Sequence, residues 1–470
     1  MMSSQWILLV IIAANLVYCN ENEIKDTTPI VYEPSWVYKC MGTDGCQRSD
    51  RPRSLVEDAS SYYDSLALCR TVCGRFGGLW PKPVSAVLSM QTVKMHPNNL
   101  RYDLSNVPAE AREMIAQMTQ VTSSNLMAEC AGNVTDLVDT RVVVYLTVRG
   151  NNLELTWDTN EEYFLDVQMK DGGVAVRIDA DNVYGARHAL ETFSQLVTTD
   201  KPDQSHQPQC GLRVIIGAKI RDKPAYRHRG LVLDTSRHFI PMKDIKRMID
   251  GMASTKLNVF HWHVTDSHSF PLESTRVPQF TRYGAYSSSD IYSVEEVRQL
   301  IKYAQIRGVR VVIEIDAPAH AGNGWQWGKD YGFGDLAVCV NAEPWRRLCI
   351  EPPCGQLNPA NPVMYRVLRN LYKDIAELLP KPAVLHVGGD EVFFGCWNSS
   401  EAIVNYMEEK GIERTVDGFI KLWGEFHTNA LQAWDEELKS LGTDEPQPVM
   451  IWSSELTQAH RVQKYLSKDR

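Results

Sequence analysis

The segment Ala383–Glu391 constrains this chain most, because a pair of glycines joins an apolar strand to two adjacent carboxylates. The apolar run Ala383–Val387 is typical of a parallel strand that is buried on both faces. Glycines directly after such a strand let backbone or a ligand approach closely. Barrels of parallel strands carry their catalytic groups where the strands end, so we expect Asp390 and Glu391 to form the floor of an active site. A solvated acidic pair at the start of a loop is the alternative.

Alternating strand and helix patterns fill residues 226–470. Five strand-like segments are separated by helical ones: Gly230–Thr235, Asn258–Thr265, Arg310–Ile315, Ala383–Val387 and Pro448–Trp452. The helix signals include a capping box at Ser293 and Glu296, and Pro362 at a first helical position. This alternation predicts a parallel sheet, either an open doubly wound sheet or a (β/α)8 barrel. No glycine-rich dinucleotide loop follows any of these strands, which disfavours a nucleotide-binding sheet.

Polar or aromatic residues follow all five strands. The five strand ends are Asp234–Arg237, His261–Asp266, Glu314–His320, Asp390–Glu391 and Trp452–Glu455. Because the carboxyl ends of parallel strands meet at one edge, this pattern predicts a single shared site at the mouth of a barrel.

Two further regions precede the parallel-strand region. Residues 20–80 are rich in cysteine, and residues 81–225 predict a small α+β domain. The β-branched run Val142–Val148 indicates a strand, and Val183–Val197 carries apolar residues at helical spacing. Arg221–Pro224 is the expected boundary before the barrel.

The chain begins with an apolar run, Trp6–Tyr18, that is too short to span a bilayer comfortably and is typical of a secretory signal. We therefore expect residues 1–19 to be a signal peptide and the protein to be secreted, although no Lys or Arg precedes the run. An uncleaved membrane anchor or a lysosomal location is the less favoured alternative. The net charge of −9 disfavours nucleic acid as a partner.

Secretion would also explain the 11 cysteines, of which ten remain after Cys19 is lost with the signal. In an oxidising compartment, disulfides are more common than scattered thiols or a zinc site. The sequence does not determine the pairing. Asn133 and Asn398 each begin an Asn-x-Ser/Thr sequon, so we expect both to carry glycans.

Several motifs together resemble family 20 β-N-acetylhexosaminidases. They are Asp234–His238, His261–His263, Asp316–His320 and His386–Glu391. The insertion Cys349–Pro359 most resembles the arthropod, chitooligosaccharide-degrading members. The resemblance covers nearly the whole chain after the expected signal.

This resemblance implies hydrolysis of terminal β-linked GlcNAc or GalNAc by substrate-assisted catalysis, in which the substrate's acetamido oxygen attacks the anomeric carbon. Glu391 would be the acid/base, which calls for a raised pKa. Asp390 would stay ionised and orient the acetamide N–H. Adjacent strand residues point to opposite sides, so we expect the two carboxylates to have different tasks. The mechanism needs no metal or other cofactor.

The resemblance also implies a set of residues that hold an oligosaccharide substrate. Arg237 would grip sugar hydroxyls, Asp266 and His320 would support the site, and Trp452 would line the pocket of the acetamido methyl. Glu351 would contact the next sugar. Each has a simpler alternative as a packed, capping or solvated side chain. Family members are often dimers, which makes a homodimer a further expectation.

A metal site is a rival interpretation of the histidines on the second strand. His261 and His263 alternate, so both rings should lie on one face, which is a metal-ligand spacing. That interpretation needs further ligands at later strand ends, and the fifth strand offers none. We therefore favour the glycosidase.

The chain also contains too few strands for a closed barrel. Five strand–helix units occupy residues 226–470, whereas a barrel of this type closes with eight strands. We therefore expect an apparently truncated (β/α)8 barrel, as a fragment of a longer protein or as a natural truncation. The alternative function is a non-catalytic, glycan-binding or degenerate protein.

Overall fold

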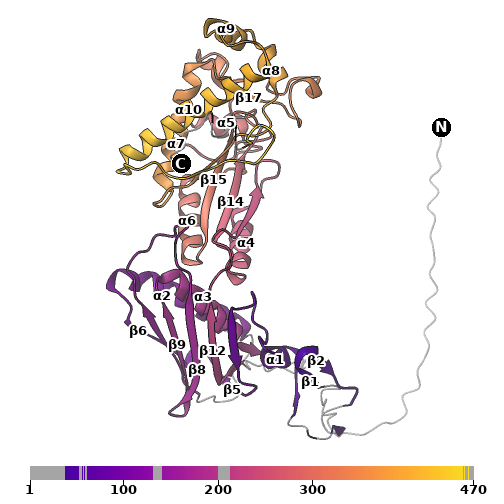
Figure 1. Cartoon of the computed structure of the whole chain (residues 1–470), viewed down its shortest axis with the longest axis vertical. Helices are drawn as coiled ribbons and strands as arrows, with labels where there is room; N and C mark the ends of the chain where they lie inside the picture. Colours follow the sequence, from indigo (N-terminus) through magenta and orange to yellow (C-terminus); the bar gives the residue numbers. More distant parts are fainter. Residues whose placement is uncertain are drawn as a thin grey trace, which may run out of the picture.

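The structure, a computed structural model, describes residues 37–51, 55–56, 58, 61–130, 140–199, 212–458, 460 and 464. Within these ranges the chain forms a small cystine-rich lobe, an α+β domain and a parallel α/β region (Figure 1). The expected signal peptide, residues 1–19, and the sequon at Asn133 lie outside the described residues.

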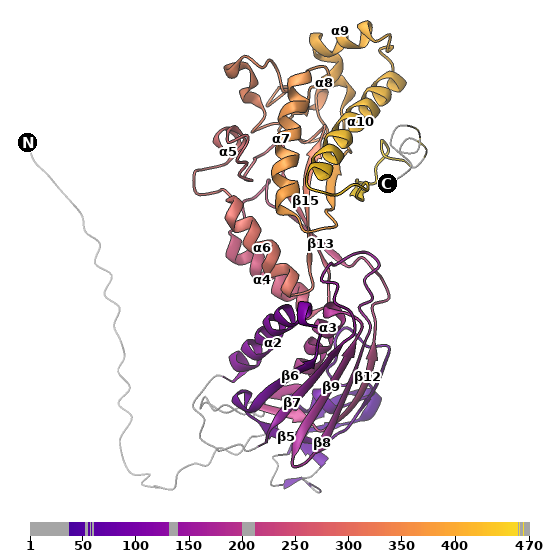
Figure 2. The ribbon, with the colours of Figure 1, turned by 90° about the vertical axis from the view of Figure 1, so that its left-hand side faces the viewer.

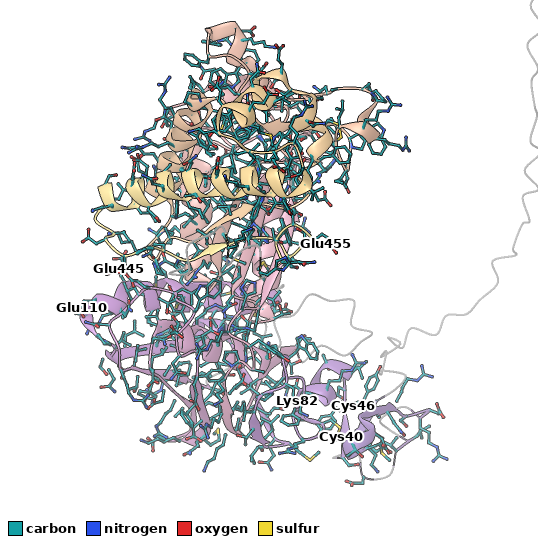
Figure 3. The ribbon with its side chains drawn as sticks, turned by 45° about the horizontal axis from the view of Figure 1, so that its top comes forward. Cys40, Cys46, Lys82, Glu110, Glu445 and Glu455 are labelled. Carbon is teal, nitrogen blue, oxygen red and sulfur yellow. A yellow bond between two sulfur atoms is a disulfide. The ribbon has the colours of Figure 1, made fainter. Side chains whose placement is uncertain are left out.

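The cystine-rich lobe is a three-stranded antiparallel sheet with one helix. Its elements are β1 (Tyr38–Cys40), β2 (Cys46–Arg48), β3 (Tyr62–Tyr63) and α1 (Leu66–Val72). Disulfides join Cys40 to Cys73, just after α1, and Cys46 to Cys69, in the middle of α1, so both cystines tie the sheet to this helix. Figure 3 places Cys40 and Cys46 in this lobe, far from Glu455 in the α/β region. The lobe is therefore remote from the expected site.

The α+β domain is built on a six-stranded sheet in the order β4-β12-β8-β9-β7-β6. The strands are β4 (Ser85–Leu88), β6 (Leu100–Asn106), β7 (Val142–Val148), β8 (Tyr163–Lys170), β9 (Gly173–Ala180) and β12 (Gly217–Asp222). A second sheet contains β5 (Thr92–Met95), β10 (Val197–Thr199) and β11 (Leu212–Ile215). Helices α2 (Ala109–Glu129) and α3 (Val183–Gln195) cover one face, on the side of the α/β region (Figure 2). The predicted strand at β7 and helix at α3 are confirmed, whereas α2 was not predicted.

The α/β region contains five parallel strands in the order β13-β14-β15-β18-β19. They are β13 (Gly230–Asp234), β14 (Val259–Thr265), β15 (Arg310–Ala317), β18 (Leu385–Gly388) and β19 (Val449–Met450). All five predicted strands are present, but β18 starts two residues later than predicted and includes the first glycine. All four pairings are parallel, so the carboxyl ends of the five strands share one edge.

Helices pack against one face of this sheet. The longer ones are α4 (Met242–Ser254), α6 (Val294–Ile306), α7 (Pro362–Leu378) and α10 (Val416–Ser440), with shorter α5 (Gln279–Gly284), α8 (Phe394–Ser399) and α9 (Glu401–Glu409). The predicted capping box forms at α6, where Ser293 and Glu296 bond each other's backbone. Asn361 caps α7 and is followed by Pro362 at the first position. One core of aliphatic and aromatic side chains fills the space between these helices and the strands.

Edge strand β13 presents apolar side chains to solvent. Leu231 and Val232 are 41 % and 48 % exposed, whereas the seven residues of β14 are all buried. A long loop after β15 carries the short hairpin of β16 (Ala337–Val338) and β17 (Gln356–Leu357). Two more disulfides, Cys339–Cys396 and Cys349–Cys354, stabilise this loop, which confirms the expectation of disulfide bonds. No helix among the described ranges is long and apolar enough to cross a membrane.

Candidate active site

The two adjacent carboxylates lie just beyond the end of β18. The backbone there is left-handed at Gly388, Gly389 and Glu391, with φ values of 63°, 90° and 51°. A non-glycine residue rarely adopts such a φ, and strain of this kind concentrates at functional sites. Asp390 and Glu391 are thus turn residues, so the expectation based on strand alternation was wrong about what orients them. The left-handed turn separates the two carboxylates instead.

Close packing on one side and a hydrogen bond on the other fix the conformation of this turn. A Cβ at Gly388 would lie 1.7 Å from the carboxyl oxygen of Asp316, so only glycine fits. On the other side, Trp423 of α10 donates its indole N–H to the carbonyl of Gly389 at 2.9 Å. Trp423 could not be assigned to the site from the sequence, because a tryptophan in an apolar helix is usually a core residue.

Glu391 begins a chain of hydrogen-bonded groups. Its Oε2 lies 3.1 Å from Nε2 of His320, and Nδ1 of His320 lies 3.1 Å from Asp266. The bond from His320 lowers the pKa of Glu391 even though partial burial opposes this shift. Burial alone would lower the pKa of His320, but the neighbouring carboxyl groups outweigh it and raise that pKa well above its ordinary value. The pair therefore shares a proton that resides on the imidazole.

The pKa of Asp390 is shifted in the opposite direction to that of Glu391. Burial raises its pKa, and the charge of Glu391 adds to that effect. In the protein alone the pKa of Glu391 is therefore lowered, where a raised one was expected, and that of Asp390 is raised, because His320 bonds Glu391 and Asp390 is the more buried. The Oδ1 atom of Asp390 is buried and has no hydrogen-bond partner within the described part of the chain. A buried acceptor in this state gains free energy from any N–H donor that reaches it.

Asp266 joins the proton-sharing pair to the expected sugar-binding residues. Its Oδ2 lies 2.8 Å from the Arg237 guanidinium and 3.1 Å from Nε2 of His263. Arg237 also lies 3.3 Å from Glu351, which sits in the short loop closed by the Cys349–Cys354 disulfide. Despite a separation of 114 positions, the structure therefore brings Arg237 and Glu351 together, as it does Asp266 and His320.

Trp452 follows β19 and is hydrogen-bonded to a buried carboxylate of the site, Glu314. Its indole N–H donates to Oε1 of Glu314 at 2.6 Å, and its backbone N–H donates to Gly388 at 3.0 Å. The other oxygen of Glu314 lies 2.6 Å from His261 and 2.9 Å from His263. Glu314 was recognised in the sequence only as part of a strand end, since a glutamate in an apolar strand carries no signal of its partners.

His261 and His263 do face the same side of β14, as predicted, and with Glu314 and His386 they could offer atoms to a metal ion. However, these atoms already bond one another. His386 Nδ1 accepts the backbone N–H of Gly388 at 3.1 Å, and Glu314 accepts from His261 and Trp452. A metal ion would have to break these bonds, so the cluster fits an internal hydrogen-bond network better.

The second sequon, at Asn398, lies on α8. The side chain is exposed, and its oxygen accepts two hydrogen bonds from Arg414, at 3.0 Å and 2.9 Å. Its glycosylation stays a prediction.

Two family models match the chain. Residues 226–469 match the catalytic domain of glycosyl hydrolase family 20, and residues 79–196 match a domain described as beta-acetyl hexosaminidase like. The first match covers the whole parallel α/β region, including all the site residues described above.

Among curated proteins, the chain is similar to two moth enzymes named chitooligosaccharidolytic beta-N-acetylglucosaminidase. It is 36 % identical over 437 residues to that of Ostrinia furnacalis, with 92 % of this chain and 70 % of the relative covered. It is 37 % identical over 415 residues to that of Bombyx mori, with 86 % and 66 % covered. The chain thus spans about two thirds of the length of these relatives.

Solved structures show the same fold. A chitobiase of Flavobacterium johnsoniae matches with a TM-score of 0.60 at 24 % identity, covering 81 % of this chain and 53 % of that chain. An exo beta-N-acetylglucosaminidase of Vibrio harveyi in complex with N-acetylglucosamine matches with a TM-score of 0.58 at 23 % identity, covering 82 % and 56 %. At this identity the likeness establishes the fold alone, a TIM-type barrel with a preceding domain, of which the described ranges contain five parallel strands.

Proposed function

The chain belongs to family 20 of the glycosyl hydrolases, and from this membership and the geometry of its site we propose that the protein removes terminal β-linked N-acetylhexosamine from the non-reducing end of oligosaccharides. The names of the moth relatives favour chitooligosaccharides as the substrate class. The reaction would retain the anomeric configuration, because the substrate's own acetamide is the first nucleophile.

The buried, unpartnered oxygen of Asp390 is the observation that carries this proposal. In substrate-assisted hydrolysis the acetamide N–H becomes acidic while its oxygen attacks the anomeric carbon. An N–H donated to Asp390 would satisfy the oxygen, and ionisation of the carboxyl would stabilise the positive charge that develops on the oxazolinium ring. The raised pKa of Asp390 in the protein alone would fall when this cationic partner forms.

Glu391 and His320 would handle the proton of the leaving group. The Nε2 atom of His320, which holds this proton, lies 3.1 Å from Oε2 of Glu391. A sugar placed against Glu391 would exclude water from its carboxylate, which favours the neutral form and draws the proton across. Glu391 could then protonate the glycosidic oxygen, and in the second step accept a proton from the attacking water.

Arg237, Glu351 and Trp452 would bind the sugars. The ion pairs from Arg237 to Asp266 and Glu351 hold the guanidinium in place, and there it would lie between the first and the next sugar. The indole of Trp452 would form an apolar wall against the acetamido methyl.

Release of chromophore from an aryl β-N-acetylglucosaminide tests the proposal. We expect turnover by the wild-type protein, and Glu391→Gln and Asp390→Asn should each lower kcat by about 10²–10⁴. Glu110→Gln, at an exposed position of α2 in the α+β domain, is the control and should leave kcat unchanged. A protein that binds chitooligosaccharides without turnover would favour the alternative of a non-catalytic glycan binder. Unchanged kcat in Glu391→Gln would refute the assignment of the acid/base.

We also propose that the protein is secreted and glycosylated. The apolar run Trp6–Tyr18, the disulfides and the exposed Asn398 support this proposal. N-terminal sequencing of the secreted protein should begin near residue 20, and peptide N-glycosidase should lower its mass. A homodimer is a further proposal, which sedimentation would test.

A further inference from the structure

Glu314 is a buried carboxylate that the reaction scheme above does not use. It lies on β15, its exposed fraction is 0 %, and its neighbours crowd both of its oxygens. Three N–H groups converge on them: the indole of Trp452 at 2.6 Å, Nε2 of His261 at 2.6 Å and Nδ1 of His263 at 2.9 Å. A buried carboxylate of this kind is stable only while its donors stay in place, because an unpaired charge there would be costly.

The two oxygens of Glu314 bond side chains on two different sides of the site. We call Trp452 the acetamide-binding wall, and His263, Asp266 and Arg237 the sugar-binding wall. Oε1 receives Trp452, whose indole also lies against the rings of His261 and His386, at 5.2 Å and 5.0 Å between centroids. Oε2 receives His263, whose other nitrogen lies 3.1 Å from Asp266. Through Asp266 the second wall continues to Arg237 and His320.

We propose that Glu314 is the positioning residue that locks the acetamide-binding wall to the sugar-binding wall, by holding Trp452 with one oxygen and His263 with the other. This inference rests on the proposed function, because it takes Trp452 and Arg237 to contact the substrate. Glu314 does not touch the substrate and acts only through these two side chains. It thereby fixes the position of the Trp452 indole relative to the Arg237 guanidinium.

Glu314→Gln tests this proposal, because glutamine has nearly the shape of glutamate but carries an NH₂ group in place of one acceptor oxygen. The NH₂ group of glutamine would face an N–H donor, either the indole or an imidazole. The indole or imidazole that faces this NH₂ group must then move away from it. A displacement on the order of 1 Å at a reacting centre costs about 100-fold in rate. We expect kcat/KM for an aryl β-N-acetylglucosaminide to fall by about 100-fold.

Glu161→Gln is the matched control. Glu161 is also buried, at 4 % exposed, and also accepts from several donors, including Arg229 at 2.6 Å and Asn258 at 3.1 Å, but it lies in the α+β domain. Its replacement should lower thermal stability about as much as Glu314→Gln, with kcat/KM unchanged. An equal loss of kcat/KM in both variants would mean that Glu314 matters only for folding, and would overturn the proposal.

A double-mutant cycle with Trp452→Phe tests the route of action. Phenylalanine keeps an aromatic wall but has no N–H to donate. If Glu314 acts through the indole, Glu314→Gln should cost about 100-fold in the wild-type background and about tenfold in the Trp452→Phe background. The same fold-loss in both backgrounds would overturn the part of the proposal that involves Trp452.

A spectroscopic measurement separates this inference from the proposed function. In ¹⁵N-tryptophan-labelled protein, the short bond to Glu314 should move the indole N–H resonance of Trp452, assigned by its loss in Trp452→Phe, downfield. Glu314→Gln should shift it upfield, and Glu161→Gln should not. A wild type without turnover would refute the proposed function, and the resonance would still decide whether Glu314 holds Trp452. An indole resonance that Glu314→Gln leaves unmoved would overturn the inference itself.

Discussion

Glu391 and His320, the two residues that share a proton in the site, both have left-handed backbone. Glu391 has a φ of 51° and His320 a φ of 54°, and their side chains meet at 3.1 Å. Each such conformation costs roughly 1–2 kcal/mol for a residue with a Cβ. The surrounding bonds, to Asp266 for His320 and across the glycine turn for Glu391, must offset that cost. Strain on both partners indicates that the position of this contact matters for function.

The charge on His263 leads to a prediction about how stability depends on pH. Burial alone would lower its pKa, but its bonds to Asp266 and Glu314 outweigh that effect and raise it to about 10. Since the pKa is raised on folding, the stabilisation is complete below the ordinary value near 6.5 and is lost as the pH rises toward 10. The free energy of unfolding lost in His263→Gln should therefore shrink between pH 7 and pH 10, by up to about 1.4 kcal/mol per unit.

Urea denaturation of the wild type and of His263→Gln at pH 7, 8.5 and 10 measures the difference between their free energies of unfolding. His427→Gln is the control, because burial lowers the pKa of His427 to about 3 and it stays neutral throughout this range. Its effect on stability should not change with pH. A gap between wild type and His263→Gln that stays constant or widens toward pH 10 would contradict a charged His263.

At the scale of elements, the glycine turn after β18 gives a sharper prediction. Gly388→Ala would place a Cβ 1.7 Å from Asp316, whereas Gly411, with the same φ of 63°, has nothing within 4 Å of its Cβ position. Gly411→Ala should thus cost only the backbone strain of roughly 1–2 kcal/mol. Gly388→Ala should cost more and should also lower kcat by at least about 100-fold, because Asp390 moves.

Thermal denaturation and aryl-glycoside kinetics on the two alanine variants distinguish these costs. If both variants lost equal stability and kept wild-type kcat, close packing of Asp316 against the turn would have no functional role.

The elements also illustrate what the sequence could and could not predict. The helix α6 was predictable because Ser293 and Glu296 form a local capping signal, and local signals need no knowledge of the fold. The helix α2 was missed because its buried positions include Thr119 and Thr122, which blur the apolar stripe. The site residues belonging to motifs were predictable, whereas Glu314 and Trp423 depend on partners 138 and 34 positions away.

At the scale of the whole molecule, the α+β domain and the α/β region are joined through buried charges. Lys256 donates to Asp222 and to the hydroxyl of Tyr163, both at 2.9 Å. Nearby, Trp157 of the α+β domain packs against Val259, Val312 and Val384 at the base of the parallel sheet. No sequence pattern predicted this interface, because its partners lie in different domains. We infer that the domains unfold together.

Lys256→Met should therefore destabilise the protein by about 3–5 kcal/mol, because it leaves Asp222 buried without its cation. Arg227→Ala is the control, since its ion pair with Asp158 is 75 % and 81 % exposed and should be worth less than about 1 kcal/mol. Calorimetry on the wild type and both variants measures the effect. Equally small losses of stability in Lys256→Met and Arg227→Ala would show that the interface does not depend on the buried pair of Lys256 and Asp222.

The central claim is that the substrate's acetamide is the nucleophile and Asp390 its partner. Fluorination of the acetyl methyl weakens that nucleophile without changing the leaving group. For aryl glycosides with zero, one, two and three fluorines, kcat/KM should fall steeply at each step, by more than about 100-fold in total. A flat series would show that a protein carboxylate attacks the anomeric carbon instead, and would contradict this account of the site.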